Sequence, residues 1–190
     1  TALKFFKTDG RYDVIGTGSL LGVSGYHTNA SSEAPIPVGY ETIIDMYPMD
    51  LEEWLWANGI KKMTIDYLYR CLEEKTPVQE AIHERMRQLL LQYCIVGGMP
   101  RAVSVFMETH NMQNVLRMQQ AIIEEYKVDM LKYAPQADKS RIRECFESIP
   151  RQLSKENKKI AYATVRPNGR GRDYQGSLQW IEDAGIIRRC

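Results

Sequence analysis

The sequence predicts a mainly α-helical protein with a small β component, an α+β fold. Between Asp50 and Ala134, apolar side chains recur at the spacing of amphipathic helices that bury one face. The same spacing returns after Pro135, in shorter segments that continue nearly to the end of the chain. In the first part of the chain, 12–16 and 40–47 have the short, apolar and β-branched pattern that is typical of strands.

Composition excludes few classes of function. Lys and Arg number 25 and Asp and Glu 24, so the charge of the whole chain indicates no partner. Hydrophobic residues make up 44%, as in a globular protein with a buried core. No apolar run approaches the roughly 20 residues of a membrane span. The cysteines lie far apart and three of them fall on apolar helical faces, which favours reduced thiols and a cytoplasmic protein without a membrane segment; they are Cys71, Cys94, Cys145 and Cys190.

The first part of the chain has a glycine-rich turn, 17–22, directly after the first predicted strand. A phosphate-binding P-loop has the pattern G-x-x-x-x-G-K-S/T, but no lysine follows Gly22. The spacing of the glycines also misses the dinucleotide-binding pattern by one residue. Residues 23–37 are polar and contain two prolines, which predicts a loop before the second strand.

The central part reads as an all-helical bundle. Asp50 is expected to cap the first helix, with Glu53 as its capping-box partner, and Thr76 with Pro77 to open the third. We expect helices at 50–58, 60–74, 76–96, 100–108 and 114–134.

The corner at Gly97-Gly98-Met99-Pro100 interrupts the least polar long segment of the chain. Glycine adopts backbone angles that other residues avoid, and proline is well suited to begin a helix. One interpretation is a buried corner between two helices. The other is that the exposed glycine backbone and the proline ring form one wall of a ligand pocket.

The last part of the chain predicts three short helices. Asp138 is expected to cap the first, which Pro150 ends or kinks, and Asp173 the last, which Gly185 ends. Residues 159–165 between them fit either a helical turn or a strand. With Ile186 and Ile187 as the start of a strand, the arrangement suits a winged helix that stops before its wing.

Several kinds of catalytic or metal site find no support. The histidines His27, His83 and His110 are far apart, and the H-E-x-x-H pattern that begins at His83 has Arg87 in its last position. No C-x-x-C pattern occurs, so a zinc site is unsupported. Nothing in the sequence pairs a serine with a base.

A basic stretch from 151 to 172 is the strongest functional signal in the residues themselves. Glu156 is its only acid, it contains Tyr162, and it ends in a glycine–arginine loop. Such a stretch could neutralise the phosphates of a nucleic acid, or it could be a solvated basic face. Its basic residues are Arg151, Lys155, Lys158, Lys159, Arg166, Arg170 and Arg172.

Longer motifs resemble a family of uncharacterised bacterial and archaeal AAA-type ATPases, which have an N-terminal P-loop domain and a C-terminal winged-helix region. The order and approximate spacing of the motifs match over nearly the whole chain. They are VIGTGSLLGV (14–23), PVG (37–39), MYPMDLEEWL (46–55), VGGMP (96–100), SIPRQLSKENKK (148–159) and WIEDAGII (180–187).

This resemblance implies that the chain is an internal piece lacking the P-loop and the acidic metal-binding strand. Residues 1–48 would be a remnant of the ATPase sheet, 49–136 a helical lid domain and 137–190 a truncated winged helix. The family's sensor strand would supply Thr17 or Ser19 to the nucleotide γ-phosphate. In its lid, Gly98, Met99 and Pro100 would pack against the adenine. An arginine common in the family is replaced by Tyr40, so a charge contribution there is in doubt.

On this basis the intact protein would be a nucleotide-driven switch that binds ATP and Mg²⁺. The chain itself would contain no catalytic residue and show no ATPase activity, because the parts that cradle the phosphates are missing. The alternatives are a DNA-binding winged helix centred on 151–172 and a protein-interaction module. A sheet without its other strands exposes edges, so truncation could also produce a dimer.

Overall fold

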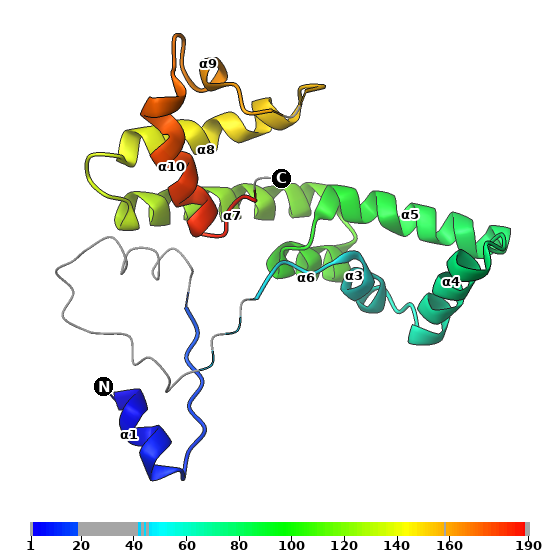
Figure 1. Cartoon of the computed structure of the whole chain (residues 1–190). Helices are drawn as coiled ribbons and strands as arrows, with labels where there is room; N and C mark the ends of the chain where they lie inside the picture. The colour runs from blue at the N-terminus through cyan, green and yellow to red at the C-terminus, as the bar shows by residue number, and fades with distance from the viewer. Residues whose placement is uncertain (1, 19–41, 43, 45, 158, 189–190) are drawn as a thin grey trace. The chain divides into compact units, whose positions relative to one another are not determined.

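The computed structural model describes residues 2–18, 42, 44, 46–157 and 159–188, and Figure 1 shows their arrangement. All regular elements of these residues are helices, which confirms the mainly helical fold. They are α1 (Ala2–Asp9), α3 (Leu51–Ala57), α4 (Lys62–Glu74), α5 (Glu80–Val96), α6 (Pro100–Thr109), α7 (Met112–Tyr133), α8 (Lys139–Leu153), α9 (Tyr162–Val165) and α10 (Gly171–Asp183).

The predicted remnant of a sheet is not supported, because the residues that the structure describes include no β-strand. Residues 12–16 have irregular backbone, and the side chain of Ile15 is 89% exposed. The second predicted strand, 40–47, falls partly outside the described residues, and its described positions are irregular too. A strand is stable only when a neighbour pairs with its backbone, and residue pattern alone cannot supply that neighbour.

The contacts divide the chain into two compact units, Ile44–Glu124 and Thr1–Ile43 with Glu125–Cys190, and the boundary falls inside α7. The division into domains at 48/49 and 136/137 stays a prediction.

The unit Ile44–Glu124 is built around Trp54 of α3, which is fully buried. Its indole N–H donates to the Leu89 carbonyl oxygen at 3.1 Å, and its ring lies 5.3 Å from that of Phe106 and 5.9 Å from that of Tyr93, centroid to centroid. The predicted capping box is confirmed, because the Glu53 N–H donates to Asp50 Oδ1 at 2.9 Å and the Asp50 N–H to Glu53 Oε2 at 2.9 Å. These contacts fix α3 against α5 and α6.

The third helix of this unit begins later than the sequence predicts, at Glu80 instead of Pro77. The Gln79 N–H donates to the hydroxyl of Tyr67 on α4 at 3.1 Å, and the first helical bond here runs from His83 N–H to the Gln79 carbonyl. A contact with a neighbouring helix therefore overrides the local start signal of Thr76 and Pro77.

In the other unit, α8 packs against both α9 and α10. Ile142, Cys145 and Ile181 are at the centre of the shared core, with exposures of 1% or less. The ambiguous segment 159–165 contains the helical turn α9, and α10 begins at Gly171, before the expected cap Asp173. Ile186 and Ile187 follow in irregular backbone, so the described residues include no strand of a wing.

Candidate nucleic-acid interface

The basic residues of 151–172 all belong to the unit that contains α8, α9 and α10. Seven of the chain's 25 Lys and Arg residues fall in this stretch, against one of its 24 Asp and Glu residues. The rest of the chain is therefore net negative. Arg151 lies in the last turn of α8, Lys155 and Lys159 in the connection to α9, Arg166 directly after α9, and Arg170 and Arg172 at the start of α10; Lys158 lies outside the described residues.

The connection between α8 and α9 is anchored by Gln152, whose side chain is buried. Its amide nitrogen donates to the Ala161 carbonyl at 2.9 Å, and its amide oxygen accepts from the Ala161 N–H at 3.1 Å. Next to it, the Lys155 ammonium donates to the Thr164 hydroxyl. The first contact joins α8 to the residue before α9, and the second joins the connection to α9, so both ends of the basic connection are held in place.

The loop between α9 and α10 wraps around Tyr162. Asn168 adopts a left-handed backbone with φ 63°. A Cβ at Gly169 would lie 2.6 Å from the Tyr162 carbonyl oxygen, and one at Gly171 would lie 3.1 Å from the Tyr162 ring. The glycines of the glycine–arginine loop are thus required for packing against Tyr162, and the arginine between them is left for the surface.

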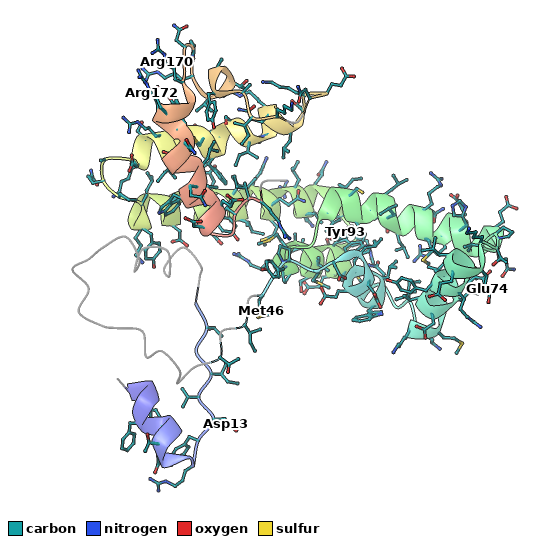
Figure 2. All side chains as sticks on the ribbon, viewed as in Figure 1. Asp13, Met46, Glu74, Tyr93, Arg170 and Arg172 are labelled. Atoms are coloured by element: carbon teal, nitrogen blue, oxygen red, sulfur yellow. The ribbon has the colours of Figure 1, made fainter. Side chains whose placement is uncertain are left out.

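Arg170 and Arg172 lie together at the amino-terminal end of α10, at the outer edge of this unit (Figure 2). Arg170 occupies the N-cap position and makes no capping bond with its side chain. Positive charge at this end of a helix opposes the macrodipole and costs about 0.3–1 kcal/mol. Helix stability therefore does not explain these two arginines.

Apart from the half-buried Lys155, the described basic side chains of 151–172 are exposed and mostly lack acidic neighbours. Within the described part of the chain, Arg151, Lys159, Arg166 and Arg170 form no ion pair, and Arg172 Nε lies 3.7 Å from Asp173 Oδ1. Their charges are consequently available to an anionic partner.

Under this surface, the Tyr174 hydroxyl of α10 donates to Glu144 Oε2 of α8 at 2.8 Å. This hydrogen bond and, to a lesser degree, burial raise the pKa of Tyr174, so the phenol stays neutral at physiological pH. Burial raises the pKa of the neighbouring Cys145 thiol to about 12, which makes it unreactive. Both groups are therefore part of the contact between α8 and α10 and not of a reactive site.

The residues expected to bind a nucleotide lie in different parts of the chain. Thr17 is exposed in irregular backbone, and Ser19 lies outside the described residues. Gly98, Met99 and Pro100 form the predicted corner between α5 and α6 in the unit Ile44–Glu124. There the Met49 N–H donates to the Gly98 carbonyl at 2.8 Å, and a Cβ on Gly98 would lie 2.0 Å from the Met49 carbonyl oxygen. The main chain at Met49 thus occupies the space beside the glycine backbone, where one interpretation of the sequence placed a ligand.

The described residues include no group of three or more His, Cys, Asp or Glu residues that could hold a metal ion. Among the same residues, no helix has both the length and the apolar character needed to cross a membrane.

Sequence reasoning missed Gln152 and the exposed face of α10. Gln152 bonds with a segment nine residues away, and no local pattern predicts such a contact. On α10, the helical spacing of apolar and polar residues in the sequence could have shown that Gln175 and Gly176 lie on the outer face.

A family model described as a domain of unknown function (DUF8612) matches residues 87–190, more than half of the chain. No curated protein and no solved structure matches. The family found is not one of AAA-type or P-loop ATPases, so the resemblance to those ATPases is wrong. The expectation of ATP and Mg²⁺ rested on that resemblance and has no other support.

Proposed function

The chain belongs to the DUF8612 family, and we propose that the matched domain is a nucleic-acid-binding module that holds the phosphate backbone of duplex DNA against residues 151–172. The observation that carries the proposal is the group of exposed basic side chains without ion pairs, described above, between the end of α8 and the start of α10. The Gln152 bonds and the packing of the loop on Tyr162 hold the backbone that bears them, so the charges are presented from a fixed scaffold.

Phosphate contacts suit this arrangement. Duplex DNA carries one negative charge per about 1.7 Å of its axis, and each phosphate neutralised by Lys or Arg releases counterions. A surface that makes about four such contacts would bind with a log–log salt slope of about −3.6. The proposal therefore predicts affinity that falls steeply with salt.

A duplex is a better partner for this surface than a single strand. Proteins that bind single strands usually stack the bases on exposed aromatic side chains. Among the described residues of 139–188, Phe146, Tyr162, Tyr174 and Trp180 are all buried or half-buried. This part of the domain accordingly offers no stacking platform.

The helix order supports the same function. Helices α8, α9 and α10 follow one another as in the helical half of a winged helix, in which the third helix enters the major groove. We infer that α10 has this role here, with the basic residues of the preceding loops on the flanking phosphates.

Charge reversal with a matched control tests the proposal. Arg170→Glu with Arg172→Glu should weaken binding to a short duplex by about tenfold or more near 0.1 M salt, measured by fluorescence anisotropy. The control is Lys61→Glu with Lys62→Glu, at the N-cap and first position of α4, where both lysines are exposed. Both pairs change the net charge equally, and acidic residues at a helix start favour the fold.

Unchanged binding in the control and a large loss in the α10 pair would support the interface. An equal loss in both pairs would show that only the overall charge matters, and no binding by the wild type would contradict the proposal.

A second candidate, a protein-interaction module, is favoured by apolar side chains on the unit Ile44–Glu124. Leu91 and Ile95 of α5 are 51% and 60% exposed, and Leu116 of α7 is 54% exposed. Gln119 Nε2 of α7 donates to the Ile95 carbonyl at 2.9 Å, which brings the two helices next to each other. In sedimentation, a molecular mass that rises with protein concentration would favour this function if Ile95→Lys abolishes the rise. A monomer at every concentration would count against self-association.

A further inference from the structure

Gly176 stands in the middle of α10, where the fold does not require a glycine. Its backbone is helical and its φ is not positive. A Cβ added there would have nothing within 4 Å, in contrast to Gly169 of the preceding loop and Gly171 at the start of α10. Glycine is among the least favourable residues in a helix interior. The helix therefore contains a residue that destabilises it, at an exposed position where close packing does not require a glycine.

The neighbours of Gly176 form one exposed polar face. Arg172, Gln175 and Gln179 are exposed and lie one turn or less from Gly176 along the helix. The opposite face of α10 is buried against α8, through Tyr174, Leu178 and Ile181. The exposed face thus combines long hydrogen-bonding side chains with one position where the helix backbone is bare.

We propose that this face of α10 lies in the major groove of duplex DNA, with Gly176 at the closest approach of the helix and Arg172 and Gln175 at the base edges. The inference rests on the proposed function. It adds the identity of the surface that recognises the base sequence of the DNA. The major groove admits an α-helix. In that groove, arginine pairs with the acceptors of guanine and glutamine with the donor and acceptor of adenine. A side chain at Gly176 would hold the helix away from the bases.

The charges of the helix indicate which end is inserted. Arg170 and Arg172 lie at the amino-terminal end together with one acid, Asp173, whereas Glu182 and Asp183 lie in the last turn, which contains no basic residue. Asp183 accepts a hydrogen bond from Gln179 Nε2 at 2.8 Å. Because phosphates repel the acidic end, the first two turns of α10 enter the groove. Helix-turn-helix proteins likewise contact bases with the first residues of their recognition helix.

The test separates binding from folding through two substitutions at one position. Gly176→Ala should raise the unfolding midpoint by about 2–4 °C, because alanine favours the helix, and should weaken binding to a short duplex. Gly176→Leu should leave the helix intact by circular dichroism and weaken duplex binding tenfold or more. The control is Ala121→Leu, at an exposed position of α7, which should leave binding unchanged.

A third variant tests base reading. Gln175→Ala should change the base preference at one position when bound sequences are selected from a random duplex pool, whereas Arg170→Glu should weaken binding to all sequences alike.

The inference and the proposed function fail in different ways. Wild-type affinity in both Gly176 variants, together with loss in Arg170→Glu plus Arg172→Glu, would overturn the inference and leave the proposed function standing. The absence of any duplex binding by the wild type would overturn both. A stability gain with a binding loss in Gly176→Ala is the expected result.

Discussion

Two junctions between helices, the α5–α6 corner and the α9–α10 loop, both contain glycines against which other chain atoms pack. At the corner, Gly98 receives the main chain of Met49, whose carbonyl also accepts from the Tyr93 hydroxyl at 2.8 Å. In the loop, Gly169 and Gly171 receive Tyr162. The junctions differ in what stands beside the glycines, which is Met99 and Pro100 in one and arginines in the other.

The comparison shows that a glycine at a junction indicates close packing of the chain. A possible function is indicated instead by the side chains next to the glycine. At the corner, the glycine pattern left open the interpretation that the glycine backbone forms one wall of a ligand pocket. At Gly98, Gly169 and Gly171 the space beside the glycine is occupied by other atoms of the protein itself. The exposed arginines of the second junction are the reason for proposing it as a binding surface.

The largest effect is expected at the corner. Gly98→Ala would place a Cβ 2.0 Å from the Met49 carbonyl oxygen, which is backbone and cannot move aside without breaking the bonds around it. We expect a loss of about 3 kcal/mol in the free energy of unfolding, measured by urea denaturation. The control is Gly176→Ala, where a Cβ meets nothing. Equal stability of the two variants would show that the corner is not packed as described.

A smaller effect is expected in the loop. Gly169→Ala would place a Cβ 2.6 Å from the Tyr162 carbonyl oxygen. Because this approach is longer than the 2.0 Å approach at Gly98, a smaller displacement relieves it, and we expect a loss of about 1–2 kcal/mol in unfolding free energy. The same displacement should move Arg170 and lower duplex affinity, which the Gly98 substitution should not do to the same degree. Normal stability and normal duplex affinity in Gly169→Ala would show that the packing of the loop on Tyr162 does not support the interface.

The smallest effect near neutral pH concerns the core under the interface. The pKa of Cys145 is about 12 in the folded protein, above the ordinary thiol value, and the pKa of Tyr174 is raised as well. A group whose pKa is raised by folding stabilises the fold below its unfolded pKa and loses that contribution as pH rises toward the folded value. Stability should therefore be flat near pH 7 and fall above about pH 9.

Thiol labelling provides the direct check of that core. In the folded protein an alkylating reagent should modify the exposed Cys94 and leave the buried Cys71 and Cys145 unmodified, as read by peptide mass spectrometry. Labelling of Cys145 at the rate of Cys94 would mean that α8 and α10 do not pack as described.

Helical periodicity predicted most of the fold, because a helix depends mainly on residues within one or two turns. The capping box at Asp50 and the corner at Pro100 are examples, since all their parts lie close together in the sequence. The predictions that failed needed distant partners. The strand at 12–16 lacks a paired neighbour among the described residues, and the start of α5 shifted because Tyr67 of another helix binds Gln79.

The candidate site was predictable in part for the same reason. Charge is visible in the sequence, so the basic residues from Arg151 to Arg172 could be named. Their support could not, because Gln152 binds Ala161 and Tyr162 fills the loop only after α8, α9 and α10 have packed. Likewise, only the structure shows that close packing does not require a glycine at position 176.

The most direct test of the central claim is the salt dependence of duplex binding. The affinities of the wild type, of Arg170→Glu with Arg172→Glu, and of Lys61→Glu with Lys62→Glu would be measured over a range of salt concentrations. Because Arg170 is placed on a phosphate and Arg172 at the base edges, loss of one phosphate contact predicts a log–log slope smaller in magnitude by about 0.9 for the α10 pair, and the wild-type slope for the α4 pair. The same slope in all three proteins would contradict the claim that the start of α10 contacts the DNA backbone.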